Sequence, residues 1–324
     1  MYAVNLDDYK HLFLDHLTKN SSVKEPKNLY EPIDYILNLG GKRLRPILVL
    51  MSCDLFGGNP KKALDAAVAI EMFHNFTLIH DDIMDKAPLR RGCQTVHNKW
   101  NLETGILSGD ALMILAYKMF DAYNLRTHKS LLNLFNQTAL ALCEGQQLDM
   151  DFETQTEVSL SDYLKMISYK TSVLIAAALK MGAIIAKANE TDAQNIYNFG
   201  LNLGIAFQLQ DDYLDVFSET NFGKQKAGDI IENKKTFLYL KCLELASESD
   251  KKILLNLFSQ KQNHPTKVAQ VVALYNKYEL SKVVKLQMDY FTTIALKYVN
   301  KLTVADAKKE LLRAFSKHLM QRTL

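Results

Sequence analysis

Apolar residues along this chain recur at intervals of three and four positions over most of its length. The stretches LDAAVAIEMFHNFTLIH, residues 64–80, and ILSGDALMILAYKMFDAY, residues 106–123, both follow this spacing. The spacing matches one face of an α-helix, and no segment alternates between apolar and polar residues for long enough to predict a sheet. The sequence therefore predicts an all-α fold.

Glycine, proline and short polar clusters mark where the predicted helices end. The chain contains only 13 glycines and 6 prolines, and no linker rich in Gly, Ser or Pro divides it. We therefore expect residues 1–324 to form one large helical domain. The helix boundaries are predicted near residues 40–41, 57–60, 88–92, 127–129, 153–161 and 221–228.

Composition and charge exclude several classes of protein. The chain of 324 residues is 48% hydrophobic and 23% charged, which is typical of a globular protein and not of a disordered one. Its formal net charge of +3 is too small to predict binding of nucleic acid. The amino terminus has neither the basic region nor the continuous apolar region of a secretory signal.

The longest apolar stretch and the cysteines bear on where the protein is located. Residues 172–186 are interrupted by Lys180 and fall short of the ~20 residues that span a bilayer, so no membrane span is predicted. The cysteines lie far apart and form no CxxC pair, which favours reduced thiols in the core of a cytoplasmic protein. They are Cys53, Cys93, Cys143 and Cys242.

Two clusters of aspartates follow apolar helical sequence, in LIHDDIMD and in FQLQDDYLD. Residues four apart share one face of a helix, so Asp81 and Asp85 project together, as do Asp211 and Asp215. Acids in the last turn of a helix oppose its dipole, so we expect a cation beside them. Magnesium suits this role because it prefers oxygen ligands and joins carboxylates to phosphates. One such cluster would more often be a solvated helix end, but two inside apolar sequence favour a function.

Basic residues form further clusters along the chain. Arginine and lysine suit diphosphate groups, although an isolated basic cluster is more often a solvated surface. Together, two acidic sites and several basic clusters predict a pocket that holds one diphosphate through metal and another directly through cations. The basic residues are Lys42, Arg43, Arg45, Arg90, Arg91, Lys170, Lys224, Lys226, Lys234 and Lys235.

The set of motifs resembles the trans-prenyl diphosphate synthases, which join isoprenoid units head to tail. The motifs are, in order, GGKRLRP, DDxxD, LRRG, SGD, EGQxxD, KT, FQxQDDxxD, GK and NK, and they run from about Gly40 to Lys235. The resemblance implies a helical bundle around a central cavity, usually a homodimer, with both aspartate motifs at the cavity mouth. It implies isopentenyl diphosphate and an allylic diphosphate as substrates.

The resemblance also assigns roles to residues. A cluster of Mg²⁺, three ions per site, would bind the allylic diphosphate through Asp81, Asp85 and Asp211, supported by Asp82 and Asp215. The same diphosphate would contact Arg90, Lys170, Gln208, Lys224 and Lys234, although Lys226 and Lys235 lie close enough to replace the last two. Isopentenyl diphosphate would contact Lys42, Arg45, His74 and Arg91. His74 taken alone would more often be a core histidine.

The chemistry that the resemblance implies starts with the allylic diphosphate. Magnesium and the basic groups would stabilise the charge that develops as its carbon–oxygen bond breaks. The double bond of isopentenyl diphosphate then attacks the allylic cation, and loss of a proton, with the departing pyrophosphate as base, gives a product five carbons longer. The oxygens of Thr171 and Gln208 would stabilise the cation, unless Thr171 instead bonds to its own helix.

Product length depends on the depth of the apolar tunnel that holds the growing chain. Phe76 precedes the first aspartate motif by five residues, about 7.5 Å along a helix, and is either the tunnel floor or an ordinary core residue. Gly200 and Gly204 either leave room beneath the diphosphate or permit close helix packing. The resemblance favours a C15 to C20 product, with C20 preferred, as in geranylgeranyl synthases.

Four rival functions differ in the motifs they require. A head-to-head synthase of the squalene type would show different spacing of the acidic residues. A class I terpene cyclase also ionises a diphosphate with magnesium, but we would expect a different second metal motif and no GGKRLRP. A noncatalytic regulatory subunit of a prenyl synthase would not need both complete aspartate motifs. A helical metal-storage or interaction module would not need the lysines and arginines that suit phosphate.

Overall fold

The computed structural model of this protein describes residues 6–20, 24–218, 227–259 and 266–321. Helices make up nearly all of these residues, which confirms the predicted fold class. Within the described ranges, the sheet is limited to one hairpin of two strands. Lys224, Lys226 and most of the boundary predicted at residues 221–228 lie outside the described residues.

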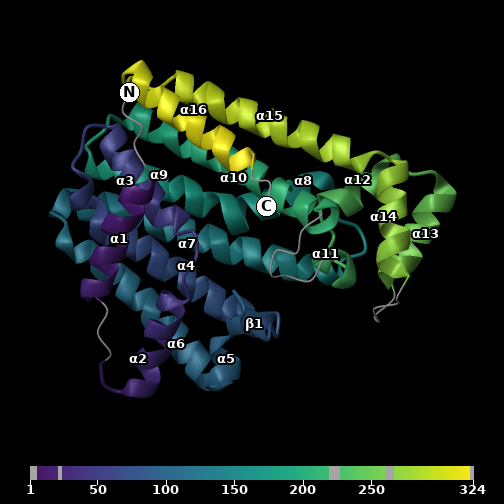
Figure 1. The fold of residues 1–324 in the computed structure, drawn as a ribbon, viewed down its shortest axis with the longest axis horizontal. Coiled ribbons are helices and arrows are strands. Elements are labelled where there is room, and N and C mark those ends of the chain that lie inside the picture. The colour runs from purple at the N-terminus through teal and green to yellow at the C-terminus, as the bar shows by residue number, and fades with distance from the viewer. Residues whose placement is uncertain (1–5, 21–23, 219–226, 260–265, 322–324) are drawn as a thin grey trace. The chain divides into compact units, whose positions relative to one another are not determined.

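The elements follow one another with short connections (Figure 1). In the amino-terminal half they are α1 (Leu6–Asn20), α2 (Lys27–Asn38), α3 (Leu44–Leu55), η1 (Pro60–Ala63), α4 (Leu64–Met84), β1 (Leu89–Arg90), β2 (Cys93–Gln94), α5 (Val96–Lys99), α6 (Leu102–Lys118), η2 (Met119–Ala122) and α7 (Leu125–Thr154). They continue as α8 (Leu160–Ile167), η3 (Ser168–Ser172), α9 (Val173–Ile185), α10 (Glu190–Phe217), α11 (Gly228–Ile231), α12 (Phe237–Leu245), α13 (Glu248–Ser259), α14 (Lys267–Lys277), α15 (Leu280–Asn300) and α16 (Asp306–Met320).

The described residues divide into two compact units. The first unit is Met1–Gln137 with Ala177–Tyr197, and the second is Thr138–Ala176 with Asn198–Leu324. Each unit has its own buried apolar side chains. That the chain is a single domain stays a prediction.

In the first unit, α4 packs against α3 and α6. Most of α4 is buried because its apolar residues surround the helix, as expected for a helix that contacts neighbours on several sides. Glycine permits the close approach of α6, since a Cβ on Gly109 would lie 2.3 Å from Nε2 of His80. The first aspartate motif therefore ends a helix that is fixed along its length.

In the second unit, α12 packs on α8 and α15, and α16 runs beside α15 (Figure 1). Glycines bring its helices together at two points. A Cβ on Gly204 of α10 would lie 2.8 Å from Cα of Ser172 in η3, and a Cβ on Gly145 of α7 would lie 2.4 Å from the backbone nitrogen of Lys170. Gly204 therefore serves close helix packing, one of the two roles predicted for it.

The hairpin after α4 is absent from the sequence prediction. Leu89 pairs with Gln94 and Arg90 with Cys93, and the two connecting residues, Arg91 and Gly92, have φ angles of 54° and 77°. Two positive φ angles define the tight turn whose twist suits antiparallel strands. Strands of two residues are too short to show alternation, so only the glycine marks this turn in the sequence.

Two other sequence predictions need correction. The boundary predicted at residues 127–129 is wrong, because α7 begins at Leu125 and Oδ1 of Asn124 accepts a hydrogen bond from the Thr127 N–H at 3.1 Å. All four cysteines are free, but only Cys53 and Cys242 are buried, and Cys93 and Cys143 are exposed. The prediction that all four lie in the core is therefore wrong for two of them.

Among the described residues, one helical run is long and apolar enough to cross a membrane. Its most apolar window, within Leu160–Ile185, has a mean hydropathy of 1.3, and 67% of that window is buried inside the protein. A buried core helix meets the same criterion, so this run is only a weak indication of a membrane span.

Candidate active site

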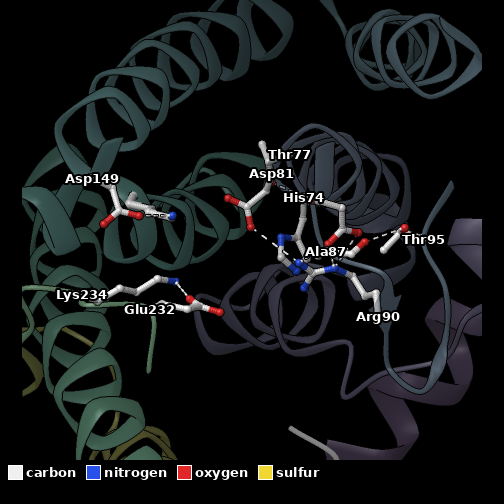
Figure 2. Close-up of polar contacts among 11 residues, drawn as sticks. His74, Thr77, Asp81, Ala87, Arg90, Thr95, Asp149, Glu232 and Lys234 are labelled. Atoms are coloured by element: carbon white, nitrogen blue, oxygen red, sulfur yellow. Dashed lines mark hydrogen bonds and ion pairs between the residues drawn. The ribbon is translucent and has the colours of Figure 1, made fainter. Parts of the chain in front are cut away.

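In the first unit, Arg90 of β1 joins the hairpin to the first aspartate motif. Its Nε donates to Oδ1 and Oδ2 of Asp82 at 2.8 and 2.9 Å, and its Nη2 lies 3.6 Å from Oδ2 of Asp81 (Figure 2). Burial raises the pKa of Asp82, which is 1% exposed, and the Arg90 guanidinium opposes that rise. Asp82 therefore holds Arg90 beside Asp81.

The base of the hairpin is closed by hydrogen bonds. Oγ1 of Thr95 donates to the Ala87 carbonyl at 2.8 Å, and the Thr95 N–H and Nδ2 of Asn98 donate to the Pro88 carbonyl at 3.2 and 3.3 Å. These bonds fix the strand that carries Arg90 relative to the end of α4. Asp85, the last acid of the motif, is the C-cap of that helix and is exposed.

The loop of the GGKRLRP motif contacts the side chain of Arg91, which is an exposed residue. Nη1 of Arg91 donates to the Gly40 carbonyl, and a Cβ on Gly41 would lie 2.9 Å from Cζ of Arg91. Gly40 and Gly41 have φ angles of +76° and +115°, which favour glycine. Lys42, the next residue, is exposed, whereas Arg43 is 5% exposed and donates to Glu71. Arg43 is thus structural, and Lys42 remains at the surface.

His74 of α4 lies among arginines and is neutral. Nη1 of Arg45 lies 3.1 Å from Nε2 of His74, and a guanidinium only donates, so Nε2 accepts and the proton is on Nδ1. Burial lowers the pKa of His74 well below its usual range, and the surrounding guanidinium charges lower it further. Those charges belong to Arg45, Arg91, Arg90 and Arg43. The arrangement suits an anionic ligand.

The pKa of His74 gives a direct test of this cluster. We expect the ¹³Cε1 resonance of His74 to show no titration midpoint near the usual ~6.5, and Arg45→Met to raise its pKa by removing one charge. The unfolded chain takes up this proton at higher pH than the folded chain, so His74 contributes stability above about pH 6.5 that is lost as the pH falls. A midpoint of ~6.5 in the wild-type protein would contradict the cluster.

Phe76 belongs to a column of rings on α4. Its ring centroid lies 5.5 Å from that of Phe73 and 4.8 Å from that of His80. Phe73 is 1% exposed, whereas Phe76 is only partly buried. Phe76 thus has packing contacts on one side and accessible surface on another, and its role as a tunnel floor stays a prediction.

In the second unit, Lys170 and Thr171 lie on η3, a single π-helical turn between α8 and α9. Such turns are frequent at functional sites. The close approach at Gly145 sets η3 against α7, and one turn further along α7 Oδ2 of Asp149 lies 2.6 Å from Nζ of Lys170 (Figure 2). The EGQxxD motif thus supplies both the contact and the carboxylate that position Lys170.

A chain of hydrogen bonds fixes Gln208 of α10. Oγ1 of Thr171 donates to its Oε1 at 3.0 Å, and its Nε2 donates to Oδ1 of Asp212 at 3.3 Å. A hydroxyl has one proton, so Thr171 does not bond to its own helix here. Tyr163 also donates to Asp212. Burial and the charge of Asp229 raise the pKa of Asp212 to about 8, although both donors oppose the rise.

Lys234 and Lys235 have different partners. Nζ of Lys234 lies 3.0 Å from Oε2 of Glu232 (Figure 2). Burial lowers the pKa of Lys234, but the charges of Glu232 and Asp229 outweigh it and hold the pKa above its usual value. Nζ of Lys235 instead donates to carbonyls at the carboxyl end of α7, with Phe152 at 2.6 Å. Lys235 therefore caps a helix.

The second aspartate motif is partly engaged by backbone donors. Oδ1 of Asp215 accepts from the Gly228 N–H at 3.1 Å, and its Oδ2 accepts from the Asp229 N–H at 3.2 Å. Asp211 lies one turn earlier on α10 and is partly exposed. Asp215 thus fixes the start of α11, as Asp82 fixes Arg90 in the first motif.

The second unit contains a cavity of about 130 Å³. Its lining combines predicted site residues with residues that sequence reasoning missed. The predicted ones are Lys170, Thr171, Gln208 and Lys234, and the missed ones include Asp149, Tyr163, Asp212 and Asp229. Asp149 and Asp212 lie within the quoted motifs. Their spacing from Gly145 and Gln208 is the sequence signal that could have identified them as site residues. Nothing in the sequence singles out Tyr163.

Across the described residues, no three His, Cys, Asp or Glu side chains gather into a preformed metal site. Asp82, Asp212 and Asp215 each accept hydrogen bonds from protein donors. Magnesium usually takes only one or two carboxylates together with water and substrate phosphate. The carboxylates of each motif fit this mode of binding.

The fold and these clusters define an all-helical chain with two aspartate-rich helix motifs, each accompanied by cations. A polyprenyl synthetase family model matches residues 26–275. The chain belongs to the polyprenyl synthetase family, as the order of its motifs indicates.

Individual relatives match over most of their length. The geranylgeranyl diphosphate synthase of Sulfolobus acidocaldarius is 37% identical over 301 residues, 91% of this chain and 90% of that protein. The geranylfarnesyl diphosphate synthase of Natronomonas pharaonis is 38% identical over 237 residues, 67% of this chain and 70% of that protein. A crystal structure of a geranylgeranyl pyrophosphate synthase covers 99% of both chains at 46% identity with a TM-score of 0.95.

Proposed function

We propose that this protein condenses isopentenyl diphosphate head to tail with an allylic diphosphate and releases pyrophosphate, giving a linear short-chain trans-prenyl diphosphate. The observation that carries the proposal is the occurrence of complete aspartate and basic motifs in a chain of this family, with Arg90, Lys170 and Lys234 each held by a carboxylate. Neither a regulatory subunit nor a storage module needs such a set of oriented charges.

The metal assigned to the aspartate motifs is Mg²⁺, as three ions per site. Asp81, Asp85 and Asp211 would hold it, with Asp82 and Asp215 in support, since carboxylate oxygens are the donors that Mg²⁺ prefers. When bound, the metal neutralises the charge that develops on the diphosphate leaving group.

The side chains of this protein have three tasks in the proposed reaction. Arg90 and the lysines at positions 170, 224 and 234 bind the allylic diphosphate, and Lys224 lies outside the described residues. Isopentenyl diphosphate is bound by Lys42, Arg45, Arg91 and neutral His74. The guanidinium groups of the two arginines present forked donors to phosphate oxygens, and the ammonium of Lys42 adds a point charge. Thr171 and Gln208 present oxygens whose dipoles stabilise the allylic cation. Pyrophosphate takes the final proton.

We propose a C20 product, within a range of C15 to C20, with Phe76 as the tunnel floor. The names of two relatives, geranylgeranyl and geranylfarnesyl diphosphate synthase, denote products that differ by one isoprene unit. We therefore infer that a local feature of the protein sets the length of the product. Phe76→Ala is expected to add at least one isoprene unit to the main product, because it removes an aromatic ring that is only partly buried. Phe73→Leu, a change to a buried ring, is the control. An unchanged product with Phe76→Ala would make Phe76 a core residue.

We further propose a homodimer located in the cytoplasm. Four large apolar side chains of α6 are exposed, which favours their burial against a second copy. They are Leu102 at 49%, Ile106 at 42%, Leu107 at 61% and Ile114 at 56%. Sedimentation of the wild-type protein against Leu107→Lys tests this, with a monomer expected for the variant.

Product analysis tests the proposed reaction. Purified protein is incubated with labelled isopentenyl diphosphate and dimethylallyl, geranyl or farnesyl diphosphate, with and without Mg²⁺. Linear C15 or C20 alcohols after dephosphorylation, formed only with Mg²⁺, are the expected result. Cyclic hydrocarbons would indicate a terpene cyclase, and no elongation from any of the three starters would indicate a regulatory subunit.

A further inference from the structure

Lys267, the first residue of α14, is a lysine withdrawn from water. It is 0% exposed, and burial lowers the pKa of its ammonium. Nζ donates to Oδ1 of Asn233 at 2.5 Å and lies 5.3 Å from the ring centroid of Phe258. Among the described residues, the acceptor of its hydrogen bond is thus a neutral amide oxygen, and the aromatic ring is a further contact.

Asn233 has the left-handed conformation that ends a helix. Its φ angle is +60°, its N–H donates to the Ile230 carbonyl at 3.3 Å, and the N–H of Lys234 donates to the Asp229 carbonyl at 2.9 Å. This pair of bonds is the turn that closes the carboxyl end of a helix, with Asn233 at the position usually taken by glycine. The bond from Lys267 fixes the side chain of that residue.

The turn at Asn233 decides where Lys234 points. Lys234 follows it directly, lines the cavity of the second unit, and has its ammonium 3.0 Å from Glu232. Consecutive Cα atoms are only ~3.8 Å apart, so a rotation about the backbone of Asn233 would swing the Lys234 side chain away. The orientation of a proposed diphosphate contact therefore depends on a turn that Lys267 restrains from outside the cavity.

Stability alone does not account for a lysine in this position. Moving an ammonium out of water costs free energy that one neutral hydrogen bond offsets only in part. A methionine of similar length would fill the same space without that cost and would keep contact with Phe258. The gain from Lys267 must then lie in the geometry it imposes on Asn233.

We propose that Lys267 is a positioning residue, which holds the turn at Asn233 and so keeps the ammonium of Lys234 in the diphosphate-binding cavity. The inference rests on the proposed function of that cavity. It separates Lys267, which contacts no substrate, from Lys234, which does.

Calorimetric titration of the full-length protein with inorganic pyrophosphate and Mg²⁺ tests the inference without turnover. Lys267→Met is expected to weaken pyrophosphate binding about tenfold, the loss of one charge-assisted contact, while its urea midpoint stays equal or rises. Lys252→Met removes an exposed lysine of α13 and is the matched control, with binding unchanged. Binding by Lys267→Met within twofold of wild type would overturn the proposal, as would a loss that follows a lowered urea midpoint.

Asn233→Gly completes a double-mutant cycle. Glycine keeps the left-handed turn but lacks the acceptor of Lys267, so the double variant is expected to bind pyrophosphate no more weakly than Lys267→Met alone. Additive losses would show that Lys267 acts by another route. Wild-type protein that binds pyrophosphate but makes no product would overturn the proposed reaction. The positioning role of Lys267 would then be decided by the pyrophosphate-binding data of the variants. Wild-type protein that binds no pyrophosphate would overturn both.

Discussion

Asp81→Asn is expected to lower kcat by roughly 10²–10³-fold, the effect of removing one preorganised electrostatic contact from a reaction centre. Asparagine has the shape of aspartate but lacks its charge, so the first motif would hold its cation less firmly. Nη2 of Arg90, 3.6 Å from Oδ2 of Asp81, would also lose one of its two carboxylate neighbours. The measurement is steady-state elongation at saturating Mg²⁺, with urea unfolding as a check on the fold.

The matched control for this variant is Asp121→Asn. Asp121 lies on η2 in the same unit, and its side chain is 70% exposed, so its neutralisation should leave activity and stability unchanged. An Asp81→Asn variant that keeps activity within threefold of wild type would remove the first motif from the reaction centre. A variant that regains activity only at much higher Mg²⁺ would support the role in holding metal.

Gly145→Ala is expected to reduce both stability and activity. The added methyl would lie 2.4 Å from the backbone nitrogen of Lys170, so η3 and α7 must separate. Overpacking of this kind costs about 1–3 kcal/mol. The separation also moves Nζ of Lys170 from Asp149, which lies 2.6 Å away, and we expect kcat/KM for the allylic substrate to fall by at least about tenfold.

A control for the added methyl is Gly105→Ala on α6. There a Cβ would lie 3.0 Å from Cδ1 of Ile83, the flexible end of a side chain, and alanine favours a helix over glycine by about 1 kcal/mol. Urea unfolding should therefore show little loss for Gly105→Ala and a lower midpoint for Gly145→Ala. Wild-type stability and activity with Gly145→Ala would mean that the approach of η3 to α7 positions nothing.

Much of the fold could be predicted because the apolar spacing that defines helices is local. The boundary before α7 was misplaced because its signal, the cap formed by Asn124, is a single polar residue among other polar residues. The hairpin that carries Arg90 was not predicted, because strands of two residues are too short to show an alternation of apolar and polar residues. The π-helical turn at Lys170 is a short polar stretch, SYKTS, between two apolar helices, and that pattern does not distinguish a π-helical turn from an α-helical one.

The candidate site was predictable where charge stands out from apolar sequence. Both aspartate motifs and most of the basic clusters are visible on that ground, although Arg43 proved to be buried against Glu71. The partners that orient these residues are harder to predict, because they depend on contacts between distant segments. Tyr163 lies 49 positions from Asp212, and Lys267 lies 34 positions from Asn233. Neither spacing follows from local pattern.

Release of pyrophosphate is the most direct test of the proposed reaction. Head-to-tail elongation, terpene cyclisation and a noncatalytic regulatory role differ in the conditions under which pyrophosphate is released. The protein is incubated with an allylic diphosphate and Mg²⁺, with and without isopentenyl diphosphate, and pyrophosphate is measured beside incorporation of the isopentenyl label. We predict one pyrophosphate per isopentenyl unit incorporated and negligible release without isopentenyl diphosphate or Mg²⁺. Release without isopentenyl diphosphate, or none under any of these conditions, would contradict head-to-tail elongation by this protein.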